Sequence, residues 1–196
     1  RDGIEVSLPS VQRTLDRLGL LKKRSLWKRL HDYTKRPEIS CPGALLEADT
    51  VHIMLPDGSR LYVYTLIDIF SRWAYAEVAG RISGAHSFKF VERAVAEAPF
   101  KFGMVQTDNG PEFQKMFRYR MGKLGILHRY SRVRQSNDQA HIERFNRTIQ
   151  EECLDGERRT IPSFRKAIRQ YLPYYNNERL HMGIDYKTPS EVLRSS

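Results

Sequence analysis

Residues 44–79 read ALLEADTVHIMLPDGSRLYVYTLIDIFSRWAYAEVA, and this stretch decides the fold class of the chain. It holds three runs rich in β-branched and aromatic residues, which we expect to be strands, at 44–54, 60–70 and 73–79. Asp57 and Gly58, between the first two runs, are a typical hairpin turn. Strands joined by such short connections predict an antiparallel start to a sheet.

Helix and strand signals alternate after this antiparallel start. The expected order is a helix, a strand, a helix and a short fifth strand, at residues 84–98, 102–107, 111–123 and 126–132. Two further helices are predicted at 137–154 and 162–176, and Thr188, Pro189 and Glu191 predict the start of a short terminal helix. This pattern indicates an α/β fold with a mixed five-stranded sheet flanked by helices.

A short amphipathic helix is predicted before this region, at residues 7–19. Ser7 is a suitable N-cap, and Gly19 is a suitable stop. Arg13 and Arg17 lie off the apolar face of this helix. The pattern is similar to the recognition helix of a helix-turn-helix, although any short amphipathic helix would show it.

Residues 1–40 also carry much of the positive charge. They hold ten Lys and Arg against five Asp and Glu, so half of the net charge of +10 lies in about a fifth of the chain. Their basic stretch, 22–40, is either a solvated linker or an arm that follows DNA phosphates. We therefore expect a partial helix-turn-helix and basic linker at 1–40, followed by an α/β core with C-terminal helices at 41–196.

Composition narrows the class of protein further. A chain of 196 residues with 40% hydrophobic content suits one domain with a small appendage. No stretch is long and apolar enough to span a membrane, and the positive charge predicts nucleic acid as the partner. The two cysteines, Cys41 and Cys153, argue against a disulfide framework or a cysteine-rich zinc site. The chain begins at Arg1 rather than Met, so we expect it to be part of a longer protein.

Three acidic residues occur where a two-metal site would need them. Asp49 lies inside the first expected strand, Asp108 ends an apolar run, and Glu143 follows 35 residues later. Mg²⁺ prefers oxygen ligands, and two ions about 3.5–4 Å apart can clamp a phosphoryl transfer. The alternative roles are a buried ion pair for Asp49, a turn or cap for Asp108, and a solvated helical position for Glu143. Ser136 and Gln139 predict a capping box, which would place Glu143 in the second helical turn.

Five strings in order carry a resemblance to a known family: EADTVHI, LIDIFSRWAYA, QTDNGPEF, HIERFNRT and YYNNERLHMGIDYKTPSEVL. Over residues 42–194 the chain resembles the catalytic core of DDE-superfamily integrases, and in particular bacterial insertion-sequence transposases. The resemblance implies a ribonuclease H-like fold. It also implies that Asp49, Asp108 and Glu143 are the catalytic residues and the ligands of two Mg²⁺ or Mn²⁺ ions. Gln139 stands where many members of the family have Asn.

The activity that this resemblance implies is metal-dependent DNA cleavage and strand transfer. Water, and then a DNA 3′-hydroxyl, would attack a phosphodiester. A ribonuclease H-like nuclease that only hydrolyses and a catalytically inactive DNA-binding protein remain alternatives. The expected partner is double-stranded DNA, both element ends and target, bound by a homo-oligomer in the bacterial cytoplasm and away from any membrane.

Basic residues before and after Glu143 predict a DNA-binding surface, with a generic charged face as the alternative. With those of the N-terminal region, the expected DNA contacts are Arg13, Arg17, Lys22, Lys23, Arg24, Arg132, Arg134, His141, Arg144 and Arg147. Asp68, a further acid in an expected strand, is predicted to be a structural partner of Ser71 or Arg72. Whether the YYNNERLH segment packs or touches DNA stays open.

Overall fold

The computed structural model describes residues 7–21, 34–132 and 138–196, and the chain divides into two compact units, Arg1–Asp32 and Tyr33–Ser196. The first unit contains helix α1 (Leu8–Arg17), where the Ser7 hydroxyl accepts the backbone N–H of Ser10. This agrees with the expected helix and its N-cap. None of the residues of α1 is buried, and its assignment to a helix-turn-helix stays a prediction.

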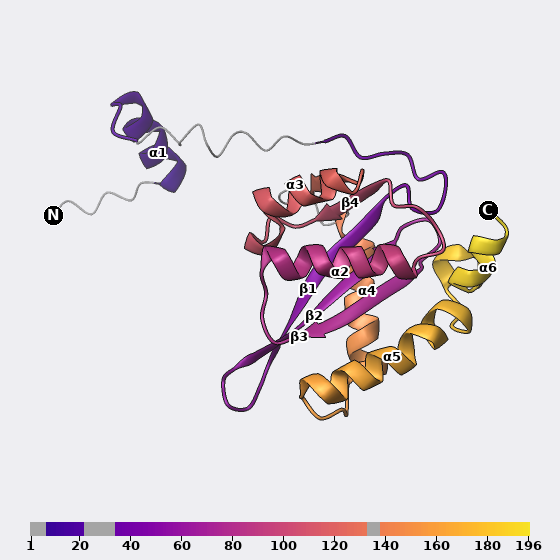
Figure 1. The fold of residues 1–196 in the computed structure, drawn as a ribbon. Coiled ribbons are helices and arrows are strands. Elements are labelled where there is room, and N and C mark those ends of the chain that lie inside the picture. The colour runs from indigo at the N-terminus through magenta and orange to yellow at the C-terminus, as the bar shows by residue number, and fades with distance from the viewer. Residues whose placement is uncertain (1–6, 22–33, 133–137) are drawn as a thin grey trace. The chain divides into compact units, whose positions relative to one another are not determined.

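The second unit is built on a five-stranded sheet in the order β3-β2-β1-β4-β5 (Figure 1). Its strands are β1 (Leu46–Met54), β2 (Arg60–Asp68), β3 (Ala74–Ala79), β4 (Met104–Thr107) and β5 (Leu127–Tyr130). The first three pair antiparallel, whereas β4 pairs parallel with β1 and with β5. Gly58 closes the β1–β2 hairpin at φ 81°, a conformation that favours glycine. The predicted mixed sheet is confirmed.

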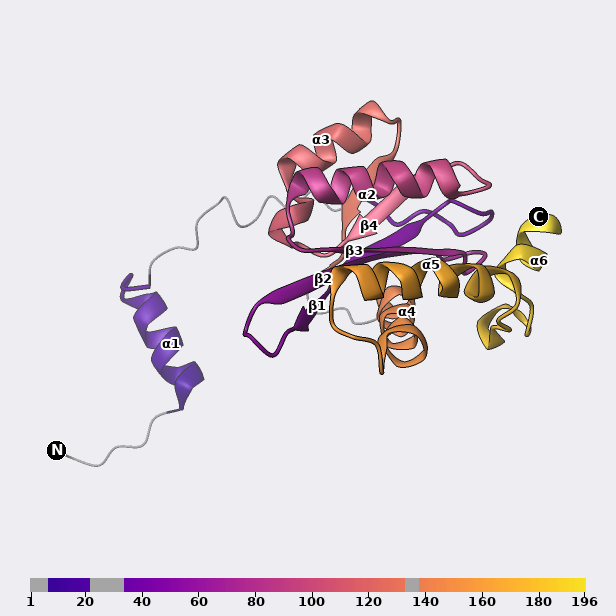
Figure 2. The same ribbon diagram turned by 60° about the horizontal axis from the view of Figure 1, so that its bottom comes forward.

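Helices cover both faces of this sheet (Figure 2). One face carries α2 (Gly84–Glu97) and α3 (Lys115–Lys123), and the other carries α4 (Ala140–Ile149) and α5 (Ile161–Asn177). Shorter turns, η2 (Pro111–Phe113), η4 (Gln150–Leu154) and η5 (Met182–Ile184), and helix α6 (Pro189–Arg194) complete the unit. The capping box predicted at Thr188 is present at the start of α6. No helix in the described ranges is long and apolar enough to cross a membrane.

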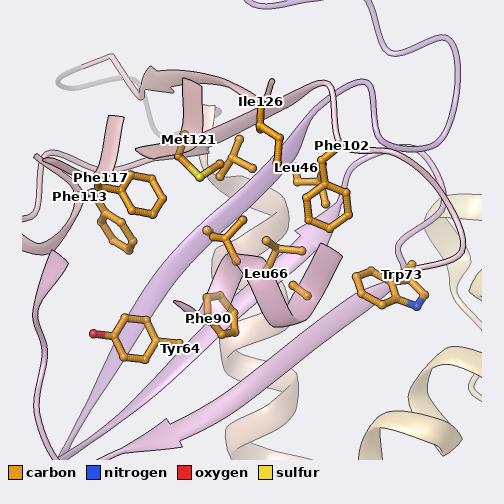
Figure 3. Close-up of a cluster of buried hydrophobic side chains, with 14 residues drawn as sticks. Leu46, Tyr64, Leu66, Trp73, Phe90, Phe102, Phe113, Phe117, Met121 and Ile126 are labelled. Atoms are coloured by element: carbon orange, nitrogen blue, oxygen red, sulfur yellow. The ribbon is translucent and has the colours of Figure 1, made fainter. Parts of the chain in front are cut away.

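Two separate clusters of buried side chains explain why β2 reads as a nearly continuous apolar run. Tyr64 and Leu66 of β2 point to the α2/α3 side, where they pack with Phe90 (Figure 3). Val63 and Ile67 point to the α4/α5 side. A strand buried on both faces lacks the alternation that a half-exposed strand shows.

Two of the expected helices were wrong in their details. The helix expected at 111–123 is divided into η2 and α3, and the helix expected at 137–154 begins at Ala140 and ends in a π-helical turn. Glu143 therefore lies in the first turn of α4 rather than the second. Ser136, part of the predicted capping box, lies outside the described residues. The Gln139 side chain makes no capping bond, and the backbone N–H of Ile142 is instead bonded by Glu47 of β1.

Candidate active site

Asp49 and Asp108 are brought together by the parallel pairing of β1 and β4. Glu47 and Gln106 are register partners in this pairing. Asp49, in the central strand β1, and Asp108, directly after β4, each lie two residues beyond this register pair. Neighbouring parallel strands thus place these two carboxylates side by side, as a site for a divalent ion requires.

The environment of the Asp49 carboxyl group is short of positive charge. Burial raises its pKa above the ordinary value, and the negative charges of Asp108 and Glu112 raise it further. Hydrogen bonds donated by the Thr50 backbone and by the Asn146 side chain act in the opposite direction. Acidic groups that repel one another in this way are typical of a site that a cation completes.

Helix α4 is bonded to β1 and β2 by Asn146. The Asn146 Nδ2 donates to Asp49 Oδ2 at 2.7 Å, and the Thr65 hydroxyl of β2 donates to Asn146 Oδ1 at 2.6 Å. Glu143 lies three residues earlier on α4 and therefore on the same side of the helix. It is exposed. Asn146 was not among the predicted site residues, although its spacing of three residues from Glu143 is a signal for it.

The third predicted acid, Glu143, does not close a metal site with this pair. Within residues 7–21, 34–132 and 138–196, no group of three His, Cys, Asp or Glu side chains is placed so that it could hold one metal ion. The donors do suit Mg²⁺ or Mn²⁺, because Asp49 and Asp108 offer hard carboxylate oxygens in a region of excess negative charge. Glu143 is the exposed acid on the side of α4 that faces Asp49.

Glu112 is a further acid at this site that was not among the predicted residues. It lies in η2, is 6% exposed, and its charge acts on Asp49. A Cβ added to Gly110 would lie 2.7 Å from Glu112 Oε2 and 2.9 Å from Asp108 Oδ1, so both carboxylates flank this glycine. The Gly110 backbone N–H donates to Asp108 Oδ1. Glu112 belongs to the QTDNGPEF string, where the family resemblance places a loop that shapes the site.

The residues predicted to contact DNA have different surroundings. Lys22, Lys23, Arg24 and Arg134 lie outside the described residues. Arg13 and Arg17 are exposed on α1. Arg132 is held by Asp138, which accepts bonds from its Nε and NH2 at 3.0 and 2.8 Å.

His141 also differs from a simple cationic DNA contact. Burial, together with the charges of Arg72 and Arg36, lowers its pKa to about 4, so it is neutral at pH 7. Arg144 and Arg147 are exposed on α4, the helix that also carries Glu143. They are the predicted contacts best placed to meet a DNA backbone beside Glu143.

We expect the double substitution Arg144→Ala/Arg147→Ala to make the salt dependence of DNA binding shallower. Each lost phosphate contact changes the slope of log K against log salt by about 0.9, so the pair should change it by about 2. Kd measured at several salt concentrations tests this. The matched control is Arg165→Ala/Arg169→Ala on α5, which removes equal charge and should leave the slope unchanged. Equal slopes in wild type and the α4 variant would contradict the prediction.

Asp68 is structural, as predicted. It is completely buried, and its Oδ2 accepts bonds from the backbone N–H and the hydroxyl of Ser71 at 2.8 and 2.7 Å. Its Oδ1 accepts the backbone N–H of Gly43 at 2.9 Å. The carboxylate therefore ties the end of β2 to the segment that precedes β1.

Asp68→Asn should lower the free energy of unfolding by about 1–3 kcal/mol, because the new amide NH₂ faces a buried N–H donor. Metal-dependent activity should persist at a temperature where the variant is folded. Urea unfolding and a cleavage assay test both parts. Asp57→Asn, in the exposed hairpin, is the control for the same chemical change and should cost much less. A variant as stable as wild type but inactive would show that Asp68 belongs to the reaction.

The YYNNERLH segment packs only in part, because Tyr174, Asn177, Glu178 and Leu180 are exposed. Tyr175 is buried against Phe145, with ring centroids 4.9 Å apart. The Asn176 amide bonds both the N–H and the C=O of Ala74, at the free edge of β3. Arg179 forms an ion pair with Glu152 at 2.6 Å. These contacts cover a sheet edge and join α5 to its neighbours.

Comparison with known proteins gives a consistent family. Two family profiles, each described as an integrase core domain, match residues 39–136 and 124–189. An uncharacterized protein of insertion element IS407 from Burkholderia multivorans is 28% identical, with 97% of this chain and 70% of the relative covered. The transposase for insertion sequence element IS904 of Lactococcus lactis is 26% identical, with 96% and 81% covered.

Solved structures agree on the fold. The HTLV-2 integrase catalytic core in complex with magnesium, in a trimeric form, superposes with a TM-score of 0.60 at 17% identity, covering 78% of this chain and 97% of that one. Likeness at this level of identity concerns the fold, and it confirms the ribonuclease H-like expectation. Because one profile alone matches half of the residues and the second continues to residue 189, the chain belongs to the integrase core domain family.

Proposed function

We propose that this chain is the catalytic part of a transposase that cuts DNA and joins DNA strands in a divalent-metal-dependent reaction. The observation that carries the proposal is the Asp49 and Asp108 pair on neighbouring parallel strands, with α4 bonded to Asp49 through Asn146. The family membership supports it, as does the relative named as the transposase of IS904.

Asp49, Asp108 and Glu143 would hold two Mg²⁺ or Mn²⁺ ions. When bound, the ions supply activation of the attacking hydroxyl and stabilisation of the leaving oxygen. Asn146 and the Thr50 N–H orient the Asp49 carboxylate, because each donates one bond and a lone pair remains available on each oxygen. The Gly110 N–H similarly orients Asp108 through Oδ1.

The proposed reaction has two steps of the same kind. Water attacks a phosphodiester at the element end, and the bond to the 3′ oxygen breaks to leave a free 3′-hydroxyl and a 5′-phosphate. This hydroxyl then attacks a target phosphodiester, forms a new bond to phosphorus, and releases a target 3′-hydroxyl. Both displacements use one set of carboxylates, so one site suffices for cutting and joining.

We further propose that the partner is double-stranded DNA, element ends and target, and that the chain acts as a homo-oligomer on it in the bacterial cytoplasm. The net charge of +10 and the exposed Arg144 and Arg147 support a polyanionic partner. The HTLV-2 catalytic core is described in a trimeric form, which supports assembly in this family. Residues 1–40 would serve as a DNA-binding appendage.

The experiment is a cleavage and joining assay with labelled DNA carrying the element ends, in Mg²⁺, Mn²⁺ and EDTA. We expect metal-dependent nicks and, in addition, products longer than the substrate. Nicks without longer products would indicate a nuclease that only hydrolyses. Binding without either product, in every metal, would indicate a DNA-binding protein without this activity and overturn the proposal.

A further inference from the structure

Glu47 is a buried carboxylate in β1 that reaches the start of α4. Its side chain is completely buried, and Oε2 accepts the backbone N–H of Ile142 at 3.0 Å. Ile142 lies in the first turn of α4, where backbone N–H groups have no partner inside the helix. Since Gln139 gives no side-chain cap, this carboxylate from another element caps the helix.

Gln106 of β4 holds the residues just before the same helix. It is the register partner of Glu47, is completely buried, and donates its Nε2 to the backbone carbonyl of Asp138. Its Oε1 accepts a bond from Arg129 NH1 at 2.6 Å. Glu47 and Gln106 each stand two residues before one of the paired aspartates. Side chains of β1 and β4, the strands next to the acid pair, therefore also form hydrogen bonds with the beginning of α4.

Arg36 contacts both Glu47 and Asp138. Its NH2 lies 3.6 Å from Glu47 Oε1, and its NH1 lies 3.6 Å from Asp138 Oδ1. Asp138 is 1% exposed and also accepts the backbone N–H of Arg132 at 3.0 Å. Burying a carboxylate without a partner costs free energy. Any rearrangement that separated Arg36 from Glu47 or Asp138 would therefore be unfavourable.

We propose that Glu47 is a positioning residue for Glu143, and that it acts by capping α4 from the strand that carries Asp49. This inference rests on the proposed function. Glu143 directly follows Ile142. The bond to the Ile142 N–H therefore fixes the position and orientation of the first turn of α4, which carries Glu143, relative to β1. Asn146 fixes the next turn against Asp49. The two bonds together hold Glu143 toward the acid pair.

The test compares the full chain with Glu47→Ala, Glu47→Gln and Asp68→Asn. Glu47→Gln keeps an oxygen that can accept the Ile142 N–H, whereas Glu47→Ala removes it. Asp68→Asn alters another fully buried carboxylate, one that bonds Ser71 and Gly43 rather than α4. Three quantities are measured: Mn²⁺ binding by electron paramagnetic resonance, amide hydrogen exchange without metal, and DNA cleavage against Mn²⁺ concentration.

We expect Glu47→Ala to weaken Mn²⁺ binding by about 10- to 100-fold, as loss of a group that orients a ligand commonly does. Exchange should quicken in residues 138–146, and the half-saturating Mn²⁺ concentration for cleavage should rise by a similar factor. Glu47→Gln should stay within about threefold of wild type in each measurement. Asp68→Asn should leave the Mn²⁺ affinity unchanged even though it lowers stability.

Unchanged Mn²⁺ binding and unchanged exchange in Glu47→Ala would overturn the inference, as would a Glu47→Gln variant as impaired as Glu47→Ala. If Glu47→Ala does not fold, Gln106→Ala replaces it. This variant removes the bond from β4 to the Asp138 carbonyl, and it should likewise weaken Mn²⁺ binding and quicken exchange in residues 138–146. Failure of the proposed function is seen separately. In that case wild type itself shows no cleavage, whereas the Mn²⁺ and exchange measurements still report whether Glu47 positions α4.

Discussion

Asp108→Asn is expected to lower the rate of metal-dependent DNA cleavage by about 1,000-fold or more. The substitution removes a negative charge from the acid pair, and the charge stabilisation that a bound metal supplies is worth several kcal/mol. Each loss of about 1.4 kcal/mol is a tenfold loss of rate. The fold should survive, because the Asn amide oxygen can still accept the Gly110 N–H. Single-turnover cleavage of labelled DNA measures the effect.

DNA binding by this variant should remain close to wild type, since it arises mainly from Lys and Arg contacts with phosphates. Asp57→Asn makes the same chemical change in the exposed β1–β2 hairpin and should leave cleavage intact. Cleavage at the wild-type rate by Asp108→Asn would remove this residue from the site. Loss of thermal stability together with activity would instead assign it a structural role.

Phe145→Ala is expected to lower the free energy of unfolding by about 3–5 kcal/mol. Phe145 is 1% exposed and lies on α4 between Arg144 and Asn146. Its ring packs edge-on against Tyr175 of α5, with centroids 4.9 Å apart. Removal of the ring leaves a cavity between two helices and the sheet. Urea unfolding followed by circular dichroism measures the loss.

Phe145→Leu provides the matched control, because it keeps most of the buried volume and should cost less than about 1.5 kcal/mol. A cost below about 1 kcal/mol for Phe145→Ala would mean that α4 and α5 are not packed tightly at this point. Since the same helix carries Glu143 and Asn146, the stability of this cluster is also a condition for the candidate site.

The elements of the fold were largely predictable because their signals are local. The three runs of residues 44–79 became β1, β2 and β3, and Thr188 caps α6 as its sequence pattern indicates. Predictions that needed the neighbours of a segment were less accurate. The predicted start of α4 at residue 137 is too early, because no side chain of the local segment caps this helix. The cap is supplied by Glu47, 95 residues away from Ile142.

Some residues of the candidate site were likewise predictable from local sequence, and others were not. Asp49 and Asp108 were recognisable, because an acid within or just after an apolar run requires an explanation. Asn146 is not among the predicted site residues, the burial of Glu112 is not predicted, and Arg132 is predicted to meet DNA although Asp138 binds its guanidinium. The roles of these residues depend on side chains that lie far from them in sequence or across a turn. The family resemblance singled out Glu143, and its role as a metal ligand stays a prediction.

Local sequence patterns and composition indicate the α/β class, the order of helices and strands, the bond between Asp68 and Ser71 and the positive charge that favours a nucleic-acid partner. Hydrophobic periodicity, caps and turns act over a few residues, so they can be read along the chain. Only the tertiary structure decided which polar groups meet. Asn146 and Asp49 are separated by 97 residues in the sequence, yet Asn146 Nδ2 lies 2.7 Å from Asp49 Oδ2. Such a bond depends on which strands and helices pack against each other. Hydrophobic periodicity within a segment does not reveal that packing.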